Sequence, residues 1–217
     1  MKGRSQEAVL RQAIVDNCRK MNAMGINQGT SGNISVRLRD GLLISPSGVS
    51  YETMTADDIV FMQFDGSYDG STVPSSEWRF HTGILKIRPD VNSVVHTHST
   101  YCTAIAIKGL EIPPLHYMIA VGGGDHIRCA PYATWGTQEL ADLAIEALED
   151  RTACLLANHG MIAVGPSVER TLWLANEVET LARQYFNTLL LGGPNLLSRE
   201  EIGRVIEKFR SYGQVCQ

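Results

Sequence analysis

The chain has 217 residues, of which 44% are hydrophobic and 19% are charged, and its formal net charge at pH 7 is −4. This composition is typical of a globular protein with a sizeable core, and the length fits one domain. The charges form no basic patch or stripe, so we expect no nucleic-acid partner. No apolar run approaches the roughly 18 residues of a membrane span, so we expect no membrane partner either.

The five cysteines are scattered along the chain, at Cys18, Cys102, Cys129, Cys154 and Cys216, and are never spaced as C-x-x-C. Small buried thiols in a reducing compartment are the simplest interpretation. The first residues also lack the apolar stretch of roughly 7–15 residues that a signal peptide contains. We therefore expect a cytoplasmic protein.

Hydrophobic periodicity predicts helices over residues 7–24, 77–88, 101–108, 137–148, 167–191 and 198–212. Short β-branched or alternating runs predict strands over residues 34–38, 42–44, 58–62, 94–98, 153–157 and 161–164. The chain contains no linker, internal repeat or low-complexity segment. The sequence therefore predicts a single α/β domain over residues 1–217 with a largely antiparallel sheet.

The predicted helix over residues 77–88 follows a polar loop. A serine of the pair Ser75-Ser76 is its expected N-cap, and Glu77 is expected in the first turn, where a carboxylate complements the helix dipole. His81 lies one turn later, and the sequence offers it no partner. We therefore expect His81 to be a helix-surface or interface residue.

Two histidines, His96 and His98, follow the short apolar run Val94-Val95. Because side chains alternate along a strand, both rings point to one face and can reach one metal ion. His159, in a turn after the apolar run 153–157, is a candidate third ligand. Three histidines with an open fourth position is the arrangement of catalytic zinc. A strand-end pair and a turn histidine that bind no metal stay open as alternatives.

Three loops are rich in small residues and hydroxyl groups, namely residues 30–33, Ser47-Gly48 and Ser75-Ser76. Each can offer backbone N–H groups and hydroxyls, and the last opens a helix, whose N-terminus favours anions. Such loops are also ordinary turns and caps. Together with a three-histidine metal site, they indicate a phosphorylated substrate held against a Lewis acid.

Several motifs, in their order along the chain, resemble the class II sugar-phosphate aldolases. They are PSSEWRFH at residues 74–81, VVHTH at 94–98, HYMIA at 116–120, CAPY at 129–132 and NHG at 158–160. The resemblance runs from the first helix to the segment around Tyr212 and so covers nearly the whole chain. It implies a three-layer α/β/α domain with a mainly antiparallel central sheet, assembled as a cyclic homotetramer with active sites at the subunit interfaces.

The same resemblance implies the site residues. One Zn²⁺ per subunit would be held by Glu77, His96, His98 and His159, and Glu77 would also transfer a proton. Tyr117 of a neighbouring subunit would exchange a proton with the aldehyde-derived oxygen. The residues implied in phosphate binding are Thr30, Gly32, Asn33, Ser47, Gly48, Ser75 and Ser76. Those implied at the aldehyde end are Trp135 and, in a tail over about residues 198–217 that helps to close the site, Phe209 and Tyr212.

The implied activity is the reversible cleavage of a ketose 1-phosphate, with L-fuculose 1-phosphate as the expected substrate, to dihydroxyacetone phosphate and L-lactaldehyde. The alternatives are another activity on a pentulose phosphate (5-deoxyribulose-phosphate aldolase, 4-epimerase or dehydratase) and a non-catalytic scaffold domain. Residues 117–120 contain no carboxylate, which disfavours the epimerase, and the complete set of Glu77 and three histidines disfavours the scaffold. We expect residues 121–128 to form a solvated charged loop, with a role in aldehyde choice as the alternative.

Overall fold

The computed structural model of the chain describes residues 2–211 and centres on one seven-stranded sheet. The strand order is β3-β2-β1-β4-β7-β6-β5. Every neighbouring pair is antiparallel except β5 and β6, which are parallel. The strands are β1 (Asn33–Leu38), β2 (Gly41–Ile44), β3 (Val60–Gln63), β4 (Ser93–Thr97), β5 (Arg128–Ala130), β6 (Ala153–Leu156) and β7 (Gly160–Gly165).

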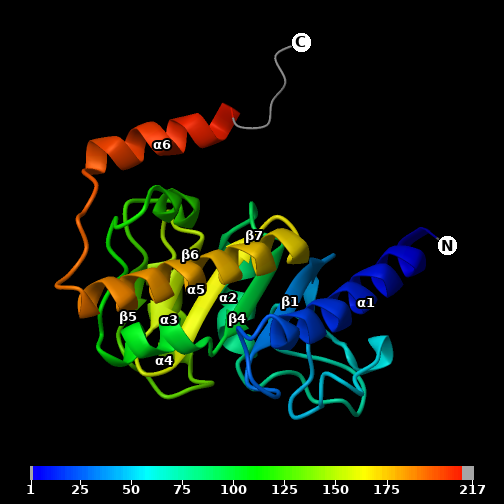
Figure 1. Cartoon of the computed structure of the whole chain (residues 1–217). Helices are drawn as coiled ribbons and strands as arrows, with labels where there is room; N and C mark the ends of the chain where they lie inside the picture. The colour runs from blue at the N-terminus through cyan, green and yellow to red at the C-terminus, as the bar shows by residue number, and fades with distance from the viewer. Residues whose placement is uncertain (1, 212–217) are drawn as a thin grey trace.

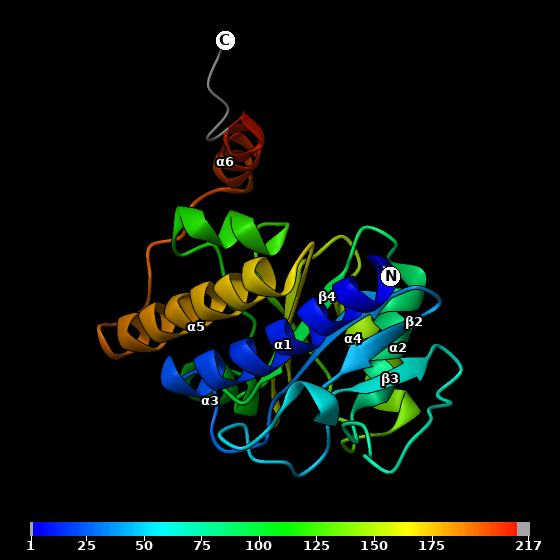
Figure 2. The ribbon, with the colours of Figure 1, turned by 90° about the vertical axis from the view of Figure 1, so that its right-hand side faces the viewer.

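Helices cover both faces of the sheet (Figures 1 and 2). They are α1 (Lys2–Ala23), α2 (Trp78–Ile87), α3 (Thr100–Ile107), α4 (Gln138–Ala147), α5 (Val168–Leu190) and α6 (Arg199–Ser211). α1, α3 and α5 pack on one face with Val95 of β4, whereas α2 and α4 pack on the other with Val94, because side chains alternate along the strand. The three-layer α/β/α fold with a mainly antiparallel sheet is confirmed.

Helix α6 stands away from these layers and contacts the short 3₁₀ helix η2 (Tyr117–Gly122) (Figure 1). Strand β5 is not predicted by the sequence, because three residues are too few to show an alternating pattern. Within residues 2–211, no helix combines the length and the apolar character that crossing a membrane requires.

Antiparallel pairing brings distant segments together at one end of the sheet. Asn33, at the start of β1, pairs with His96 near the end of β4, and Thr97 pairs with Met161 of β7. The β6–β7 turn therefore lies beside the end of β4. Gly160 makes this approach feasible, because a Cβ atom there would collide with the carbonyl oxygen of Thr97.

Candidate metal centre

Four side chains converge at this end of the sheet, namely Glu77, His96, His98 and His159. His96 lies on β4, His98 directly after it, His159 in the β6–β7 turn and Glu77 immediately before α2. One possible ligand atom from each residue lies within 4.8 Å of those from the others. The structure therefore brings together the set of candidate ligands that the sequence indicated.

The closest atoms of these side chains have the spacing of metal ligands. Nε2 of His96 lies 3.0 Å from Nε2 of His98 and 3.2 Å from Oε2 of Glu77. Nε2 of His159 lies 3.1 Å from Oε1 of Glu77. Tetrahedral ligands at roughly 2.0–2.1 Å from a zinc ion are about 3.3 Å apart. One ligand atom from each of the four side chains lies within 4.8 Å of the others, so the side chains would need to draw closer to share one cation.

The histidine rings present their nitrogens in the form that binds metals. Nδ1 of His96, which is fully buried, lies 2.9 Å from the carbonyl oxygen of Met161 and donates to it. With Nδ1 as the donor to this carbonyl, the other ring nitrogen, Nε2, faces the cluster. Burial, followed by the proximity of His96 and His159, lowers the pKa of His98 to about 4. The His98 ring is therefore neutral at pH 7.

Glu77 is a buried carboxylate, with only 5% of its surface exposed. Burial by itself raises the pKa of Glu77, but the adjacent imidazoles of His96 and His159 more than offset this, so its pKa lies well below the usual range. Among the described residues, Oε1 has no hydrogen-bond partner of good geometry although it faces His159. Leaving a buried carboxylate oxygen without a partner costs free energy, and a bound cation would remove that cost. The residues therefore fit a divalent metal.

The expectation that His81 lies at a surface or interface is wrong. His81 is fully buried and faces the sheet, with Nδ1 2.7 Å from Oγ of Ser35 and Nε2 2.5 Å from Oδ1 of Asn33. Burial, and then the proximity of His96, lowers the pKa of His81 to about 3. The Nδ2 group of Asn33 donates to Oε2 of Glu77 at 2.9 Å, so His81 is connected to the cluster.

The position of Glu77 on its helix also differs from the expectation. Glu77 is the N-cap residue of α2 rather than a first-turn residue, and its side chain makes no capping hydrogen bond. The carboxylate is instead turned toward the histidines. Residues four apart lie on the same face of a helix. The expectation that Glu77 binds a metal in the interior could therefore have predicted that His81 faces inward as well.

The three small-residue loops meet beside the cluster. The N–H of Ser75 donates to the carbonyl of Ser45 at 3.0 Å, and Oγ of Ser45 accepts from the N–H of Ile34 at 3.1 Å. Ile34 directly follows Asn33. Through Ser45, these hydrogen bonds therefore connect β1, the end of β2 and the loop before α2. A Cβ atom on Gly32 would lie 2.6 Å from the carbonyl oxygen of His96, so this position requires glycine.

The residues implied in phosphate binding differ in accessibility. Four of them are exposed, namely Thr30, Ser47, Gly48 and Ser76, and three are buried, namely Gly32, Asn33 and Ser75. Both ends of the Asn33 amide are already engaged, by His81 and by Glu77. The Asn33 side chain therefore belongs to the buried interior, whereas the four exposed residues are accessible to a ligand.

Trp135 lies in the loop between β5 and α4, and 64% of its surface is exposed. The next residue, Gly136, accepts a hydrogen bond from Arg79 of α2 at 2.7 Å and lies beside the carbonyl of Ser76. The loop that carries the indole therefore abuts the start of α2, where Ser75, Ser76 and Glu77 are located.

Tyr117 and Phe209 lie together but are not part of the cluster. Their ring centroids are 6.3 Å apart, and both line a cavity of about 1090 Å³ between η2, α5 and α6. Among the described residues, none of the four clustered side chains lines this cavity. Tyr117 is 49% exposed. Tyr212, expected beside Phe209, lies outside the described residues.

The charged loop over residues 121–128 is less solvated than expected. The Asp125 side chain is only 17% exposed and accepts from Arg199, at the start of α6, at 2.9 Å. It also lies 2.6 Å from Nδ1 of His126 and 3.6 Å from Arg151. The expectation of a solvated loop is therefore wrong for Asp125, which ties the loop to the helix that carries Phe209.

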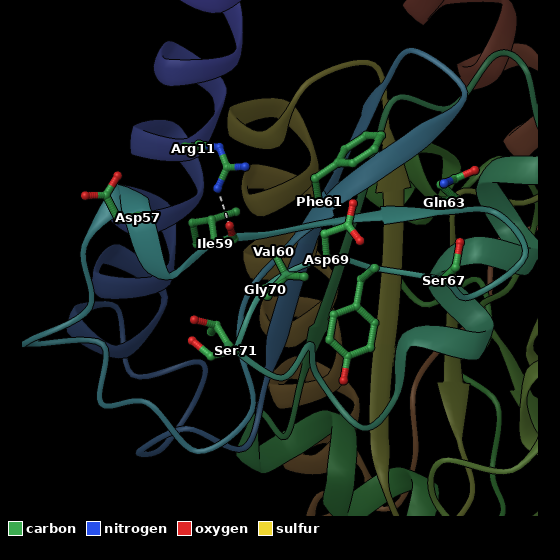
Figure 3. Close-up of a pocket in the computed structure, with 12 residues that line it drawn as sticks. Arg11, Asp57, Ile59, Val60, Phe61, Gln63, Ser67, Asp69, Gly70 and Ser71 are labelled. Atoms are coloured by element: carbon green, nitrogen blue, oxygen red, sulfur yellow. Dashed lines mark hydrogen bonds between the residues drawn. The ribbon is translucent and has the colours of Figure 1, made fainter.

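A second cavity, of about 460 Å³, lies between α1 and β3 (Figure 3). Its lining includes Arg11, which is paired with Glu7 at 2.9 Å and donates to the carbonyl of Ile59. The guanidinium is thus already engaged within the chain. None of the residues from the sequence motifs lines this cavity among those that the structure describes, so we place the chemistry at the histidine cluster.

Residues 12–186 match the family described as Class II Aldolase and Adducin N-terminal domain. The chain belongs to this family. It is 50% identical over 205 residues to L-fuculose phosphate aldolase of Escherichia coli K12, covering 94% of this chain and 95% of that protein. A solved structure of an L-fuculose 1-phosphate aldolase superposes on it with a TM-score of 0.90 at 37% identity, covering 93% of this chain and 96% of that one.

A second type of relative is almost as similar. The 5-methylthioribulose-1-phosphate/5-deoxyribulose-1-phosphate aldolase of Rhodospirillum rubrum is 49% identical over 208 residues, covering 96% of this chain and 94% of that protein. These relatives are all named as aldolases, which confirms the family expected from the motifs. The chain is a carbon–carbon lyase of the class II aldolase family.

Proposed function

We propose that this lyase is a zinc-dependent aldolase that reversibly cleaves L-fuculose 1-phosphate to dihydroxyacetone phosphate and L-lactaldehyde. The observation that carries the proposal is the buried cluster of Glu77, His96, His98 and His159 beside three connected loops rich in N–H and hydroxyl donors. The relative from E. coli K12 that is 50% identical and named for L-fuculose phosphate supports the choice of substrate.

Glu77 and the three histidines are the proposed metal ligands, with one ion per subunit. Three imidazoles and one carboxylate suit Zn²⁺, whereas Mg²⁺ and Ca²⁺ prefer sites built from oxygen ligands. When bound, the metal would supply Lewis-acid polarisation of the ketose carbonyl.

The side chains supply the proton transfers. Cleavage of the C3–C4 bond requires that the C4 hydroxyl lose a proton and that C3 gain one. Glu77, ionised at pH 7 because its pKa is lowered, is the proposed proton carrier at C3. Tyr117 of a neighbouring subunit is the proposed carrier at the C4 oxygen, where a phenol is a suitable acid. No lysine is required, so a Schiff base is not part of the proposal.

The exposed loop donors are proposed to bind the substrate phosphate. The donors are Thr30, Ser47, Gly48 and Ser76, which are exposed, and Ser76 lies next to the start of α2, whose N-terminus favours an anion. Contacts far from the bond that breaks would orient the ketose and use its binding energy at the reacting carbon atoms. Trp135 is proposed to line the aldehyde pocket, and the tail over about residues 198–217, with Phe209 and Tyr212, to help close it.

We also propose a cyclic homotetramer with active sites at its subunit interfaces. Tyr117 is half exposed and lines a cavity to which, among the described residues, none of the four clustered side chains contributes. Its proposed role therefore requires the cluster of another subunit. A cytoplasmic location is proposed as well, and the free thiols of Cys18, Cys102, Cys129 and Cys154 are consistent with a reducing compartment.

A second candidate substrate is 5-methylthioribulose 1-phosphate or 5-deoxyribulose 1-phosphate. A relative named for both is 49% identical to this chain, against 50% for the fuculose phosphate relative, so identity barely separates them. All three ketoses would yield dihydroxyacetone phosphate and differ only in the aldehyde. The residues at the aldehyde end, Trp135 among them, would therefore decide between them.

A coupled assay tests the proposal. Purified protein with Zn²⁺ is supplied with each of the three ketose 1-phosphates, and the release of dihydroxyacetone phosphate is followed. We expect the highest kcat/KM for L-fuculose 1-phosphate and loss of turnover in Glu77→Gln. Turnover of the 5-substituted ribuloses alone would change the substrate but keep the reaction class. No turnover of any substrate, or unchanged turnover in Glu77→Gln, would refute the mechanism.

A further inference from the structure

A row of buried polar side chains leads from the sheet, through α2, to the carboxylate of Glu77. In order they are Ser35, His81, Asn33 and Glu77, with exposed fractions of 0%, 0%, 3% and 5%. Successive contacts are 2.7, 2.5 and 2.9 Å long. Only Glu77 belongs to the candidate metal ligands. His81 and Ser35 have no role in the proposed function as it stands.

The hydrogen positions in this row follow from its ends. An ionised carboxylate only accepts hydrogen bonds, so Asn33 must turn its NH₂ group toward Oε2 of Glu77. The amide oxygen of Asn33 then faces Nε2 of His81 and needs a donor, so Nε2 carries the proton. In a neutral ring Nδ1 is an acceptor, and the hydroxyl of Ser35 donates to it. Each side chain thus fixes the orientation of the next.

We propose that His81 is a positioning residue of the aldolase, which, together with Ser35, locks the Asn33 amide with its NH₂ group toward Glu77. Without the Nε2–H donor, the amide of Asn33 loses the bond that determines its orientation. A flipped amide would place its oxygen against the carboxylate, and two facing acceptors are unfavourable. The lock therefore holds Oε2 of Glu77 in place. The inference rests on the proposed role of Glu77 as the proton carrier.

A pair of matched variants separates positioning from simple packing, because the His81 ring also stacks on Phe80 with centroids 4.6 Å apart. His81→Gln keeps an N–H donor near the place of Nε2, whereas His81→Leu fills the core without one. For His81→Leu we expect kcat to fall about 10- to 100-fold and KM to change little. His81→Gln should recover most of kcat. Equal kcat values in the two variants would overturn the proposal.

Nitrogen-15 NMR of histidine-labelled wild-type protein tests the lock without any substrate. The His81 signals are identified by their absence from His81→Gln. We expect a protonated Nε2 and an unprotonated Nδ1, with the Nδ1 signal shifted in Ser35→Ala, which removes only the small donor. A proton on Nδ1 instead would overturn the proposal, even if His81→Leu fails to fold. Because this measurement is independent of turnover, an inactive protein with the expected tautomer would refute the proposed function but not the lock.

Discussion

The two ends of the candidate active site are built in different ways. At the metal end His96 is fully buried and Glu77 is 5% exposed. Strand pairing places Asn33 beside His96, and the Asn33 amide holds the carboxylate of Glu77. At the proposed aldehyde end Trp135 is 64% and Tyr117 49% exposed, and both lie outside the strands. One chain thus preorganises the groups that handle charge, while the groups that would shape the substrate lie exposed on its surface. We therefore expect a mutation at the metal end to impair the site of its own chain, and a mutation of Tyr117 to impair the site of a neighbouring subunit.

The largest effect is expected from breaking the buried end. His96→Ala removes a ring that is held by Met161 and faces both His98 and Glu77. We expect bound zinc to be lost and the release of dihydroxyacetone phosphate to fall to background. Zinc per chain is measured by elemental analysis, with His126→Ala, a histidine outside the cluster, as the control that retains the metal. A full equivalent of zinc in His96→Ala would contradict the assignment.

Tyr117→Phe should lower kcat by about 10²-fold, because the proposed acid at the C4 oxygen is removed. Zinc content should stay at the wild-type level, since Tyr117 lines a cavity that contains none of the four clustered side chains among the described residues. Steady-state kinetics and elemental analysis of the same sample check both statements. A loss of zinc would show that the two ends are not separate.

Mixing subunits tests whether the exposed end serves a neighbour. Glu77→Gln and Tyr117→Phe proteins are unfolded together in equal amounts and refolded. If Tyr117 acts on the adjacent subunit, random assembly gives about one site in four with both groups intact, so about a quarter of wild-type activity should return. If Tyr117 acted within its own chain, every chain would carry one defect and no activity would return.

A smaller effect is expected at the junction behind the metal end. Glu179 of α5 accepts from the N–H groups of Tyr101 and Cys102 at 2.9 and 2.8 Å and so caps α3, which begins just after His98. Glu179→Gln should reduce the free energy of unfolding by about 1–2 kcal/mol, as measured by urea denaturation. Glu177→Gln, on the same helix, is the matched control. Equal stability of both variants would show that the cap contributes nothing.

The smallest effect is expected where the charged loop holds α6. Burial raises the pKa of Asp125, but hydrogen bonds from His126 and Arg199 outweigh this, so its pKa lies below the usual value. A lowered pKa in the folded state means that the bond stabilises above the unfolded-state pKa of about 3.9 and is lost as the pH falls through the folded value. Asp125→Asn should therefore increase hydrogen exchange in α6 at pH 7, by less than about 1 kcal/mol in protection.

The difference between this variant and wild type should shrink as the pH falls through the folded-state pKa of Asp125, where the wild-type carboxyl group becomes protonated as well. Glu201→Gln, which loses a bond to Arg204 within α6 itself, serves as the control. A difference between Asp125→Asn and wild type that grows as the pH falls would contradict the assigned sign.

The sequence predicted the metal end better than the proposed aldehyde end, because local patterns indicate the metal ligands. Because side chains alternate along a strand, the sequence predicts that His96 and His98 point to the same face. It also predicts His159 in a turn that follows an apolar run. Local patterns therefore indicate the three histidine ligands. The pattern does not show that α2 faces polar Ser35 and Asn33 on the sheet, and the expectation for His81 was therefore wrong. The relation of Tyr117 to any cluster depends on contacts between distant segments or subunits, which no local pattern encodes.

The central claim is that the four clustered side chains hold a metal that aldol cleavage requires. The most direct test is to deplete the protein of metal with a chelator and to titrate it with Zn²⁺ while dihydroxyacetone phosphate release from L-fuculose 1-phosphate is followed. The account predicts negligible turnover at the start and a linear recovery that ends at about one zinc ion per chain. Full turnover by the metal-depleted protein would contradict it.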